Sequence, residues 1–238
     1  MQRSHHNCFL IIPASGSGSR MKSTTPKQYL QLENGLTILD QSLKTLLKLD
    51  DIIGCVVAIP QDDEYFQISN YQKHGKMLAI AEGGQERFHS VLNALNTLAE
   101  FAKPDDWVLV HDAVRPCVKA SDVQALINEL KDGGDGGILA TPMVDTLKRA
   151  DDFEVQKTID REGLFQAQTP QMFKFSTLVK ALENVVSGDA HITDEAEAVA
   201  RTGAKVKIVI GSKSNIKITV AEDIALANYY LRPLNDEN

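Results

Sequence analysis

Short apolar runs along the chain alternate with segments in which apolar residues recur every three or four positions. The runs, which we predict as strands, are Cys8–Ile12, Ile52–Ile59, Met77–Ala81, Trp107–His111 and Gly137–Thr141. Most are apolar throughout rather than at alternate positions, which is typical of strands covered on both faces. Between them, one-face helical spacing is shown by Leu39, Leu43, Leu46 and Leu47, and again by Val91, Leu95, Leu98, Ala99 and Ala102. Strands alternating with helices predict parallel pairing with right-handed crossovers, and therefore an open α/β sandwich.

The pattern changes after Thr141. Two polar, strand-like pieces, Val144–Arg149 and Glu154–Ile159, are joined by a short turn at 150–153 and predict a β-hairpin. This hairpin has too few apolar residues to form a core, and an isolated hairpin is marginally stable in water. We therefore expect it to lean on another surface, most simply that of a second copy of the chain.

The α/β rhythm returns in the C-terminal third. We predict helices at Ser176–Val186 and Asp194–Arg201, a strand at Lys205–Ile210, and a last helix from about Ala221 to Leu231. Thr219 and Glu222 have the spacing of a capping box at the start of that helix. Internal repeats and low-complexity linkers are absent from the sequence, so we predict one domain over residues 1–238, with a projecting arm at about 142–162.

Composition narrows the functional classes. The 238 residues carry a formal net charge of −7, which argues against a nucleic-acid-binding face rich in Lys and Arg. The first apolar run is stopped by Pro13, too early for a signal peptide or a membrane span. The three cysteines, Cys8, Cys55 and Cys117, are far apart and set among apolar neighbours, which favours buried thiols in a reducing cytoplasm.

A glycine-rich loop follows the first predicted strand at residues 13–21, Pro-Ala-Ser-Gly-Ser-Gly-Ser-Arg-Met. Its glycines let backbone N–H groups surround an anion without obstruction by Cβ atoms. The loop lacks the Gly-Lys-Ser/Thr ending of a Walker loop, and Met21 stands where a dinucleotide-binding fingerprint requires its third glycine. The loop instead carries Arg20 and is followed by Lys27 after Pro26, which predicts a phosphate-binding loop that supplies its own cations. The simpler alternative is a flexible surface loop with basic residues.

Further clusters are predicted at the same carboxyl edge of the sheet, where α/β proteins place their ligands. Gly83-Gly84-Gln85-Glu86-Arg87 opens a helix that has Ser90 in or near its first turn, and the segment 111–116, His-Asp-Ala-Val-Arg-Pro, ends a strand. Thr193-Asp194 begins a helix, and Asn215–Thr219 reads as a short strand with Lys217 alone among apolar residues. Each cluster taken alone is compatible with an ordinary cap or turn, but their convergence at one edge favours a binding site.

Taken in order, these motifs resemble the 2-C-methyl-D-erythritol 4-phosphate cytidylyltransferase family of the non-mevalonate isoprenoid pathway. The resemblance runs from about Leu10 to Leu231. Besides the clusters above, it includes Pro26-Lys27-Gln28-Tyr29, Asp145-Thr146 with Lys148, Asp160-Arg161, Gln168-Thr169-Pro170-Gln171, and Ile192-Thr193-Asp194-Glu195. It implies a Rossmann-like three-layer sandwich of the nucleotide-diphospho-sugar transferase type with a projecting β-arm.

The resemblance also implies a reaction, in which CTP and methylerythritol phosphate give the CDP-alcohol and pyrophosphate with a divalent ion, normally Mg²⁺. The residues suit this chemistry, because a phosphate monoester with a second pKa of about 6 is already a nucleophile at neutral pH and needs no general base. Catalysis would then consist of positioning and charge stabilisation. The sequence departs from the family at Ser15, where alanine is usual, and at Ser19, where some members have a basic residue.

The roles implied by the resemblance fall into four groups. Arg20 and Lys27 would stabilise the transition state, while Arg161 and Lys217 would hold the incoming phosphate. The nucleotide shell would comprise Pro13, Ala14, Gly16, Gly18, Gly83, Gly84, Ser90 and Asp112, with Asp112 near the metal, directly or through water. Contacts to the polyol phosphate would come from Arg115, Thr146, Thr169 and Thr193. In the family the arm embraces a second subunit, so Arg161 and Thr169 would complete the partner's site in a cytoplasmic homodimer.

Two alternative functions remain open at this point. A cytidylyltransferase acting on ribitol 5-phosphate would share the nucleotide half and differ around Arg115, Thr146 and Thr193. A non-catalytic nucleotide-binding regulator would keep the glycine loop but would be expected to lack Lys27 or Lys217, and both are present. A dehydrogenase is disfavoured by Met21.

Overall fold

A mixed sheet of seven strands forms the centre of the molecule. The computed structural model describes residues 7–16, 25–131, 133–188 and 191–232. Strand order is β3-β2-β1-β4-β8-β5-β9, and a separate two-stranded sheet pairs β6 with β7. The strands are β1 (Cys8–Pro13), β2 (Ile52–Ile59), β3 (Met77–Glu82), β4 (Trp107–Val110), β5 (Gly136–Pro142), β6 (Leu147–Asp151), β7 (Glu154–Ile159), β8 (Phe165–Lys174) and β9 (Val206–Ile210).

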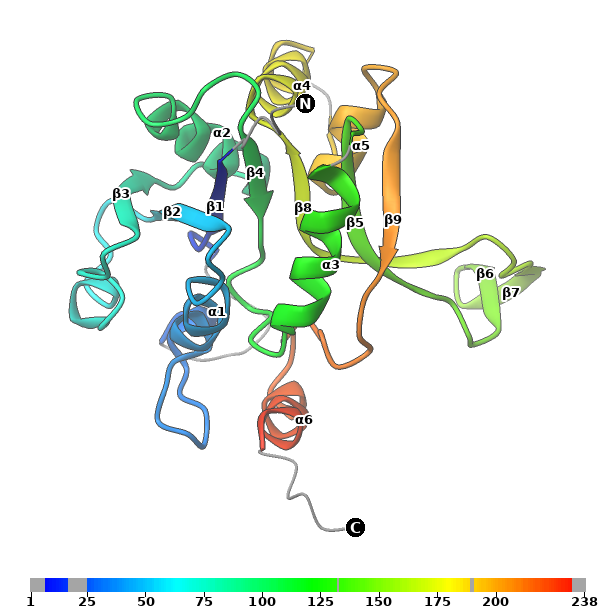
Figure 1. The fold of residues 1–238 in the computed structure, drawn as a ribbon. Coiled ribbons are helices and arrows are strands. Elements are labelled where there is room, and N and C mark those ends of the chain that lie inside the picture. The colour runs from blue at the N-terminus through cyan, green and yellow to red at the C-terminus, as the bar shows by residue number, and fades with distance from the viewer. Residues whose placement is uncertain (1–6, 17–24, 132, 189–190, 233–238) are drawn as a thin grey trace.

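Helices cover both faces of the large sheet, which confirms the predicted three-layer α/β architecture (Figure 1). The helices are α1 (Ile38–Leu46), α2 (Arg87–Leu98), α3 (Ala120–Lys131), α4 (Phe175–Ser187), α5 (Glu195–Ala200) and α6 (Glu222–Leu231), with short 3₁₀ turns η2 (Lys27–Tyr29) and η3 (Phe66–Ile68). Helices α1 and α3 pack on one face and α2, α4 and α5 on the other.

Strand β1 shows why its sequence is apolar at every position. Cys8, Leu10 and Ile12 face the core under α1 and α3, whereas Phe9 and Ile11 face the core under α2 and α4. All five side chains are buried. A central strand covered on both sides has no solvent-facing position, and alternation is therefore lost.

The five predicted N-terminal strands are confirmed to within one residue at each end, and predicted strands that are neighbours in the sheet pair in parallel as expected, but the sheet also contains an antiparallel strand that was not predicted. Strand β8 lies antiparallel between β4 and β5, while the other neighbouring pairs in the sheet are parallel. Both β8 and helix α3 are absent from the elements predicted above. Strand β8 is polar and contains Pro170, which is unusual in a central strand. In α3, the spacing of Val123, Leu126, Ile127 and Leu130 is that of one helix face, so this helix could have been predicted from the sequence.

Two local predictions near the C-terminus are corrected. Residues 215–219 form no strand: the segment makes a backbone hydrogen bond from the Ile218 N–H to the Val114 carbonyl at 2.9 Å, and side chains make other contacts, with Asn215 Nδ2 donating to the carbonyl of Thr169 at 2.8 Å and Arg115 Nη1 donating to the carbonyl of Asn215 at 2.7 Å. The capping box is also wrong. The carboxylate of Asp223, not of Glu222, accepts hydrogen bonds from the N–H groups of Thr219 and Val220 and from the Thr219 hydroxyl.

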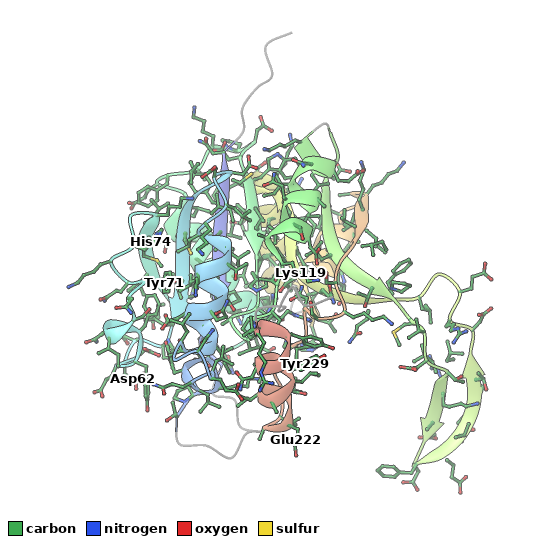
Figure 2. The ribbon with its side chains drawn as sticks, turned by 60° about the horizontal axis from the view of Figure 1, so that its bottom comes forward. Asp62, Tyr71, His74, Lys119, Glu222 and Tyr229 are labelled. Atoms are coloured by element: carbon green, nitrogen blue, oxygen red, sulfur yellow. The ribbon has the colours of Figure 1, made fainter. Side chains whose placement is uncertain are left out.

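The predicted hairpin is confirmed, although its first strand begins at Leu147 rather than Val144. It stands away from the rest of the chain in both views (Figures 1 and 2). Its turn places Asp152 and Phe153 at positive φ values of 45° and 63°. Phe153 is fully exposed and Val155 is 63% exposed. An arm with apolar side chains and no core of its own agrees with the expectation that another surface covers it.

Candidate active site

The first cavity lies at the carboxyl edge of the sheet and has a volume of about 520 Å³. The segment after β1, the turn η2, the start of α2 and the segment after β4 all contribute to it. The lining residues are Pro13, Ala14, Ser15, Gly16, Lys27, Gln28, Gly84, Gln85, Glu86, Arg87, Asp112, Ala113, Val114 and Lys217. The glycine-rich loop and the predicted clusters at 83–87, 111–116 and 215–219 therefore meet around one cavity, as expected at the common carboxyl edge of parallel strands.

The turn before α2 depends on its two glycines. A Cβ on Gly83 would lie 2.3 Å from the Cβ of Ser15, and a Cβ on Gly84 would lie 2.3 Å from the Cβ of His89. The buried hydroxyl of Ser90 accepts a hydrogen bond from the Gly84 N–H at 2.9 Å and is bonded to the Ser15 hydroxyl at 2.7 Å. The Ser15 hydroxyl thus forms a hydrogen bond that links the first loop to α2.

Lys27 is placed by its neighbours in the turn η2. Gln28 is buried and donates through Nε2 to the carbonyl of Ala14 at 2.6 Å, while the Tyr29 hydroxyl donates to Asp63 at 2.8 Å. Both anchors lie on residues that follow Lys27, and its half-exposed side chain lines the cavity. The sequence Pro-Lys-Gln-Tyr therefore fixes the backbone while presenting the ammonium group.

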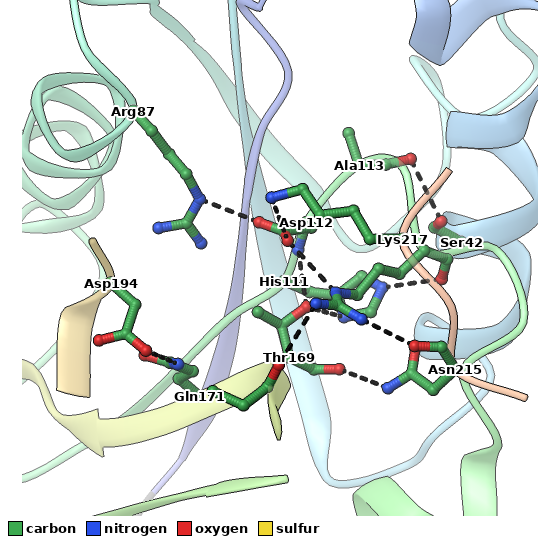
Figure 3. A network of polar contacts seen from close by, with 12 residues as sticks. Ser42, Arg87, His111, Asp112, Ala113, Thr169, Gln171, Asp194, Asn215 and Lys217 are labelled. Carbon is green, nitrogen blue, oxygen red and sulfur yellow. Dashed lines mark hydrogen bonds and ion pairs between the residues drawn. The ribbon is translucent and has the colours of Figure 1, made fainter. Parts of the chain in front are cut away.

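Asp112 is a buried carboxylate surrounded by three cations (Figure 3). Its Oδ1 is 2.9 Å from Arg87 Nε, and its Oδ2 is 3.3 Å from Arg115 Nε and 3.1 Å from Lys217 Nζ. Burial alone would raise the pKa of Asp112, but Arg87, Lys217 and Arg115 together hold that pKa well below its usual range. The group is a permanent anion in a region of net positive charge.

A second cavity, of about 590 Å³, adjoins the first at Lys217. Arg115 lines only this one, and Lys217, whose side chain is 41% exposed, lines both. Other lining residues come from the start of the arm, from β8 and from the segment before α6: Thr141, Pro142, Met143, Val144, Asp145, Gln166, Gln168, Lys213, Asn215, Ile216, Thr219 and Asp223. The two cavities can thus hold two anionic molecules on either side of one ammonium group.

A network of buried hydrogen bonds supports the backbone segment that carries Asp112. The backbone N–H of Asp112 donates to Thr169 Oγ1 at 3.0 Å, and Thr169 Oγ1 also lies 3.0 Å from His111 Nδ1. Because the carbonyl of Arg115 can only accept, neutral His111 carries its proton on Nε2, which donates to that carbonyl at 3.2 Å, and Nδ1 accepts the Thr169 hydroxyl proton. Thr169 therefore orients the Asp112–Arg115 turn, and its hydroxyl proton is already donated to His111.

The buried His111 in this hydrogen-bond network makes the free energy of unfolding depend on pH. Burial lowers the pKa of His111 to about 4 from its ordinary 6.5. Between these values the unfolded chain takes up a proton that the folded chain excludes, so His111 lowers stability as the pH falls from 6.5 towards 4, by about 3 kcal/mol in total. We expect His111→Gln to reduce this slope. Urea unfolding of both proteins at about pH 7 and pH 4.5 measures it, and parallel pH profiles would contradict the assignment.

The other predicted site residues are distributed as follows. Gly83 and the buried Ser90 are not among the residues that line the first cavity. Thr146 and Arg161 are exposed beside the arm, and Arg161 Nη1 donates to the carbonyl of Val144. Thr193 is exposed before α5, where its hydroxyl donates to Glu197 at 3.0 Å. Within the described part of the chain, these three side chains are not among those lining either cavity. Gly18 and Arg20 lie outside the described residues.

Two charged residues of the network received no role from the sequence. Arg87 Nη1 pairs with Glu195 Oε1 at 2.5 Å, and the Glu195 side chain is completely buried. Both belong to the motifs quoted above, Gly-Gly-Gln-Glu-Arg and Ile-Thr-Asp-Glu. Their contact joins the starts of two helices 108 positions apart, which spacing along the chain does not reveal.

The described residues contain no cluster of three or more His, Cys, Asp or Glu side chains suited to hold a metal ion. Within the described residues, the carboxylates that line the first cavity are those of Glu86 and Asp112. Among the helices of the described ranges, none has the length and apolar character to cross a bilayer.

Comparison with known proteins adds independent information. The family model described as 2-C-methyl-D-erythritol 4-phosphate cytidylyltransferase matches residues 8–233. Proteins named 2-C-methyl-D-erythritol 4-phosphate cytidylyltransferase include one from Ruthia magnifica, to which the chain is 54% identical, with 94% of this chain and 96% of the relative covered. One from Vibrio vulnificus is 46% identical, with 97% of each chain covered.

A solved structure agrees with these sequence matches. The crystal structure of 2-C-methyl-D-erythritol 4-phosphate cytidylyltransferase from Francisella tularensis has 39% identity and a TM-score of 0.83, covering 94% of this chain and 100% of that one. The resemblance inferred from the motifs is confirmed. On its sequence and its fold, the chain belongs to the 2-C-methyl-D-erythritol 4-phosphate cytidylyltransferase family.

Proposed function

We propose that this protein transfers CMP from CTP to 2-C-methyl-D-erythritol 4-phosphate, giving 4-CDP-2-C-methyl-D-erythritol and pyrophosphate. Its membership of a family with that activity supports the proposal. The observation that carries it is Lys217, an ammonium group that lines two adjoining cavities at the carboxyl edge of the sheet. One cavity suits CTP and the other the polyol phosphate, so their phosphates meet at a cation.

The chemistry requires no proton transfer. A phosphate oxygen of the acceptor, already ionised at neutral pH, attacks the α-phosphorus of CTP. The bond from that phosphorus to the oxygen bridging to the β-phosphate breaks, and the electron pair leaves with pyrophosphate. The obstacle is repulsion between two polyanions, which cations and backbone N–H groups reduce. Arg20 and Lys27 serve the α-phosphate in this proposal, and Lys217 with Arg161 orients the acceptor.

The nucleoside would be recognised next to the Gly83–Gly84 turn. Substituents on either glycine would collide with Ser15 or His89, so the backbone approaches the cavity closely there. We propose that this backbone-lined slot accepts a pyrimidine and excludes a larger purine. Contacts to the polyol phosphate come from Arg115, with Thr146 and Thr193 as further candidates.

We propose Mg²⁺ as the metal, carried into the site largely by the triphosphate. Mg²⁺ commonly binds through one or two carboxylates and substrate phosphates rather than in an all-protein cage. Asp112 fits the protein's share, because Oδ1 has one ion-pair partner in Arg87 and a carboxylate oxygen accepts two hydrogen bonds or ligands. When bound, the ion would reduce the negative charge of the triphosphate.

We also propose that the chain forms a single domain and acts as a homodimer in which the arm reaches the partner's site. Two features support this. Phe153 at the tip of the arm is fully exposed, and Arg161 at its base points to Val144 rather than into either cavity of its own chain. We place the reaction in the cytoplasm, which the free, buried thiols of Cys8, Cys55 and Cys117 support.

The test is pyrophosphate release with CTP and each of two acceptors, 2-C-methyl-D-erythritol 4-phosphate and ribitol 5-phosphate, with Mg²⁺ present or chelated. We expect rapid release only with the first acceptor, and only with the metal. A strong preference for ribitol 5-phosphate would replace the proposed substrate. No release with either acceptor, together with tight CTP binding, would indicate a nucleotide-binding regulator instead.

A further inference from the structure

Arg87 occupies an electrostatically unfavourable place. It is the first residue of α2, where the unpaired N–H groups of the helix favour an anion and disfavour a cation. Its side chain is compensated by two carboxylates from distant parts of the chain, Asp112 at 2.9 Å and Glu195 at 2.5 Å. Burial alone would lower the pKa of Arg87, but these two carboxylates raise it. The guanidinium is therefore a fixed charge between two anions.

Glu195 is the less expected partner, because its side chain is completely buried. One oxygen pairs with Arg87, and within the described residues the other, Oε2, has no hydrogen-bond partner. A buried carboxylate carries a large desolvation cost and persists only where a cation compensates it. Arg87 supplies that cation, so the two groups are mutually dependent.

The backbone that carries Glu195 is held rigidly. Gln171 in β8 donates through Nε2 to Asp194 at 2.9 Å (Figure 3). It also accepts the N–H of Ala196 at 2.9 Å. Asp194 also caps α5 by accepting the N–H of Glu197 at 2.9 Å. Glu195 thus lies between two anchored residues, and its carboxylate holds the Arg87 guanidinium in one position.

We propose that Glu195 and Arg87 are positioning residues that set the orientation of the Asp112 carboxylate. The terminal torsion of an aspartate is soft, so a free carboxylate would rotate. Arg87, held by Glu195, fixes Oδ1 and leaves Oδ2 directed at Lys217 and Arg115. In the proposed reaction, on which this inference rests, the pair determines where Lys217 lies when the acceptor phosphate arrives.

Two conservative variants test the pair. Arg87→Lys keeps the charge but replaces a planar fork by a single point charge that does not serve both carboxylates. Glu195→Gln keeps the shape and removes the anchor's charge. We expect kcat to fall about 10- to 100-fold in each, since misplacing a catalytic group by about 1 Å costs a factor of this order. The KM for CTP should change less than about threefold in Glu195→Gln, because Glu195, unlike Arg87, does not line the first cavity.

Matched controls come from exposed ion pairs. Arg201→Lys makes the same change next to α5, in the pair with Glu197, and Glu129→Gln makes the same change in the pair with Lys207. Both should keep wild-type kcat. The double variant of Arg87 and Glu195 should be no worse than the poorer single variant by more than about threefold, because the residues act as a unit.

A spectroscopic measurement separates this inference from the proposed function. In protein labelled with ¹⁵N-arginine, the Arg87 Nε–H signal should be sharp, and Glu195→Gln should broaden or shift it in the absence of any substrate. If the wild-type protein fails to turn over while this change is seen, the proposed function fails and the positioning link remains. An unchanged Arg87 signal, or wild-type kcat in folded Arg87→Lys and Glu195→Gln proteins, overturns the inference.

Discussion

Replacing Lys27 by alanine is expected to lower kcat at least about a hundredfold, because removing one donor that stabilises a developing charge has an effect of this size. Lys27 lines the first cavity together with Gly16 and Asp112. The expected loss lies in the chemical step rather than in folding. The neighbouring side chains of Gln28 and Tyr29 hold the turn η2, and both remain in the variant.

Two measurements check this prediction. Steady-state kinetics with CTP and methylerythritol phosphate gives kcat, and thermal denaturation should show a Tm within a few degrees of the wild type. Lys48→Ala, which removes an exposed lysine after α1, serves as the control and should leave both values unchanged. Turnover of Lys27→Ala close to that of the wild type would remove Lys27 from the catalytic machinery.

Mixing two inactive variants is expected to restore activity. We predict that Arg161→Ala and Lys27→Ala are each nearly inactive alone, since each removes a cation from every site. In a twofold dimer with shared sites, a mixed dimer has one site lacking both groups and one site with both intact. Random exchange of equal amounts should therefore recover up to about a quarter of the wild-type rate.

The geometry of the arm is the reason for this expectation. Arg161 is exposed at the base of the hairpin and lines neither described cavity of its own chain, whereas Lys27 lines the first. Subunit exchange is verified by native mass spectrometry of differently tagged chains, and each variant mixed with itself provides the background rate. A mixture that stays inactive after verified exchange would place both residues in one site built within a single chain.

Much of the fold follows from local patterns. The strands β1, β2 and β4 are apolar at every position because helices cover both faces, and this pattern was visible along the chain. Strand β8 was not visible, because its buried residues include Gln168, Thr169 and Gln171, which hydrogen-bond to other segments instead of packing in an apolar core. A polar strand is recognisable only once its neighbours are known.

In the candidate site, too, some features could be predicted from the sequence and others could not. Glycines and cations that follow a strand could be predicted, since the carboxyl edge of a parallel sheet gathers them. The part played by Thr169 could not, because it depends on β8 lying antiparallel to β4 beside His111. The contact of Arg87 with Glu195 likewise requires α2 and α5 to begin at the same edge, which only tertiary structure establishes.

The proposed site supplies cations and backbone N–H groups rather than a nucleophilic side chain, so the acceptor phosphate should attack the α-phosphorus directly and in line with the departing pyrophosphate. The most direct test is the stereochemical course with CTP carrying sulfur in place of one α-phosphate oxygen, as a single diastereomer. A direct attack inverts the configuration at phosphorus, and inversion is the result we predict. Retention would mean two successive displacements through a covalent CMP–enzyme intermediate, and would contradict a mechanism based on positioning and charge alone.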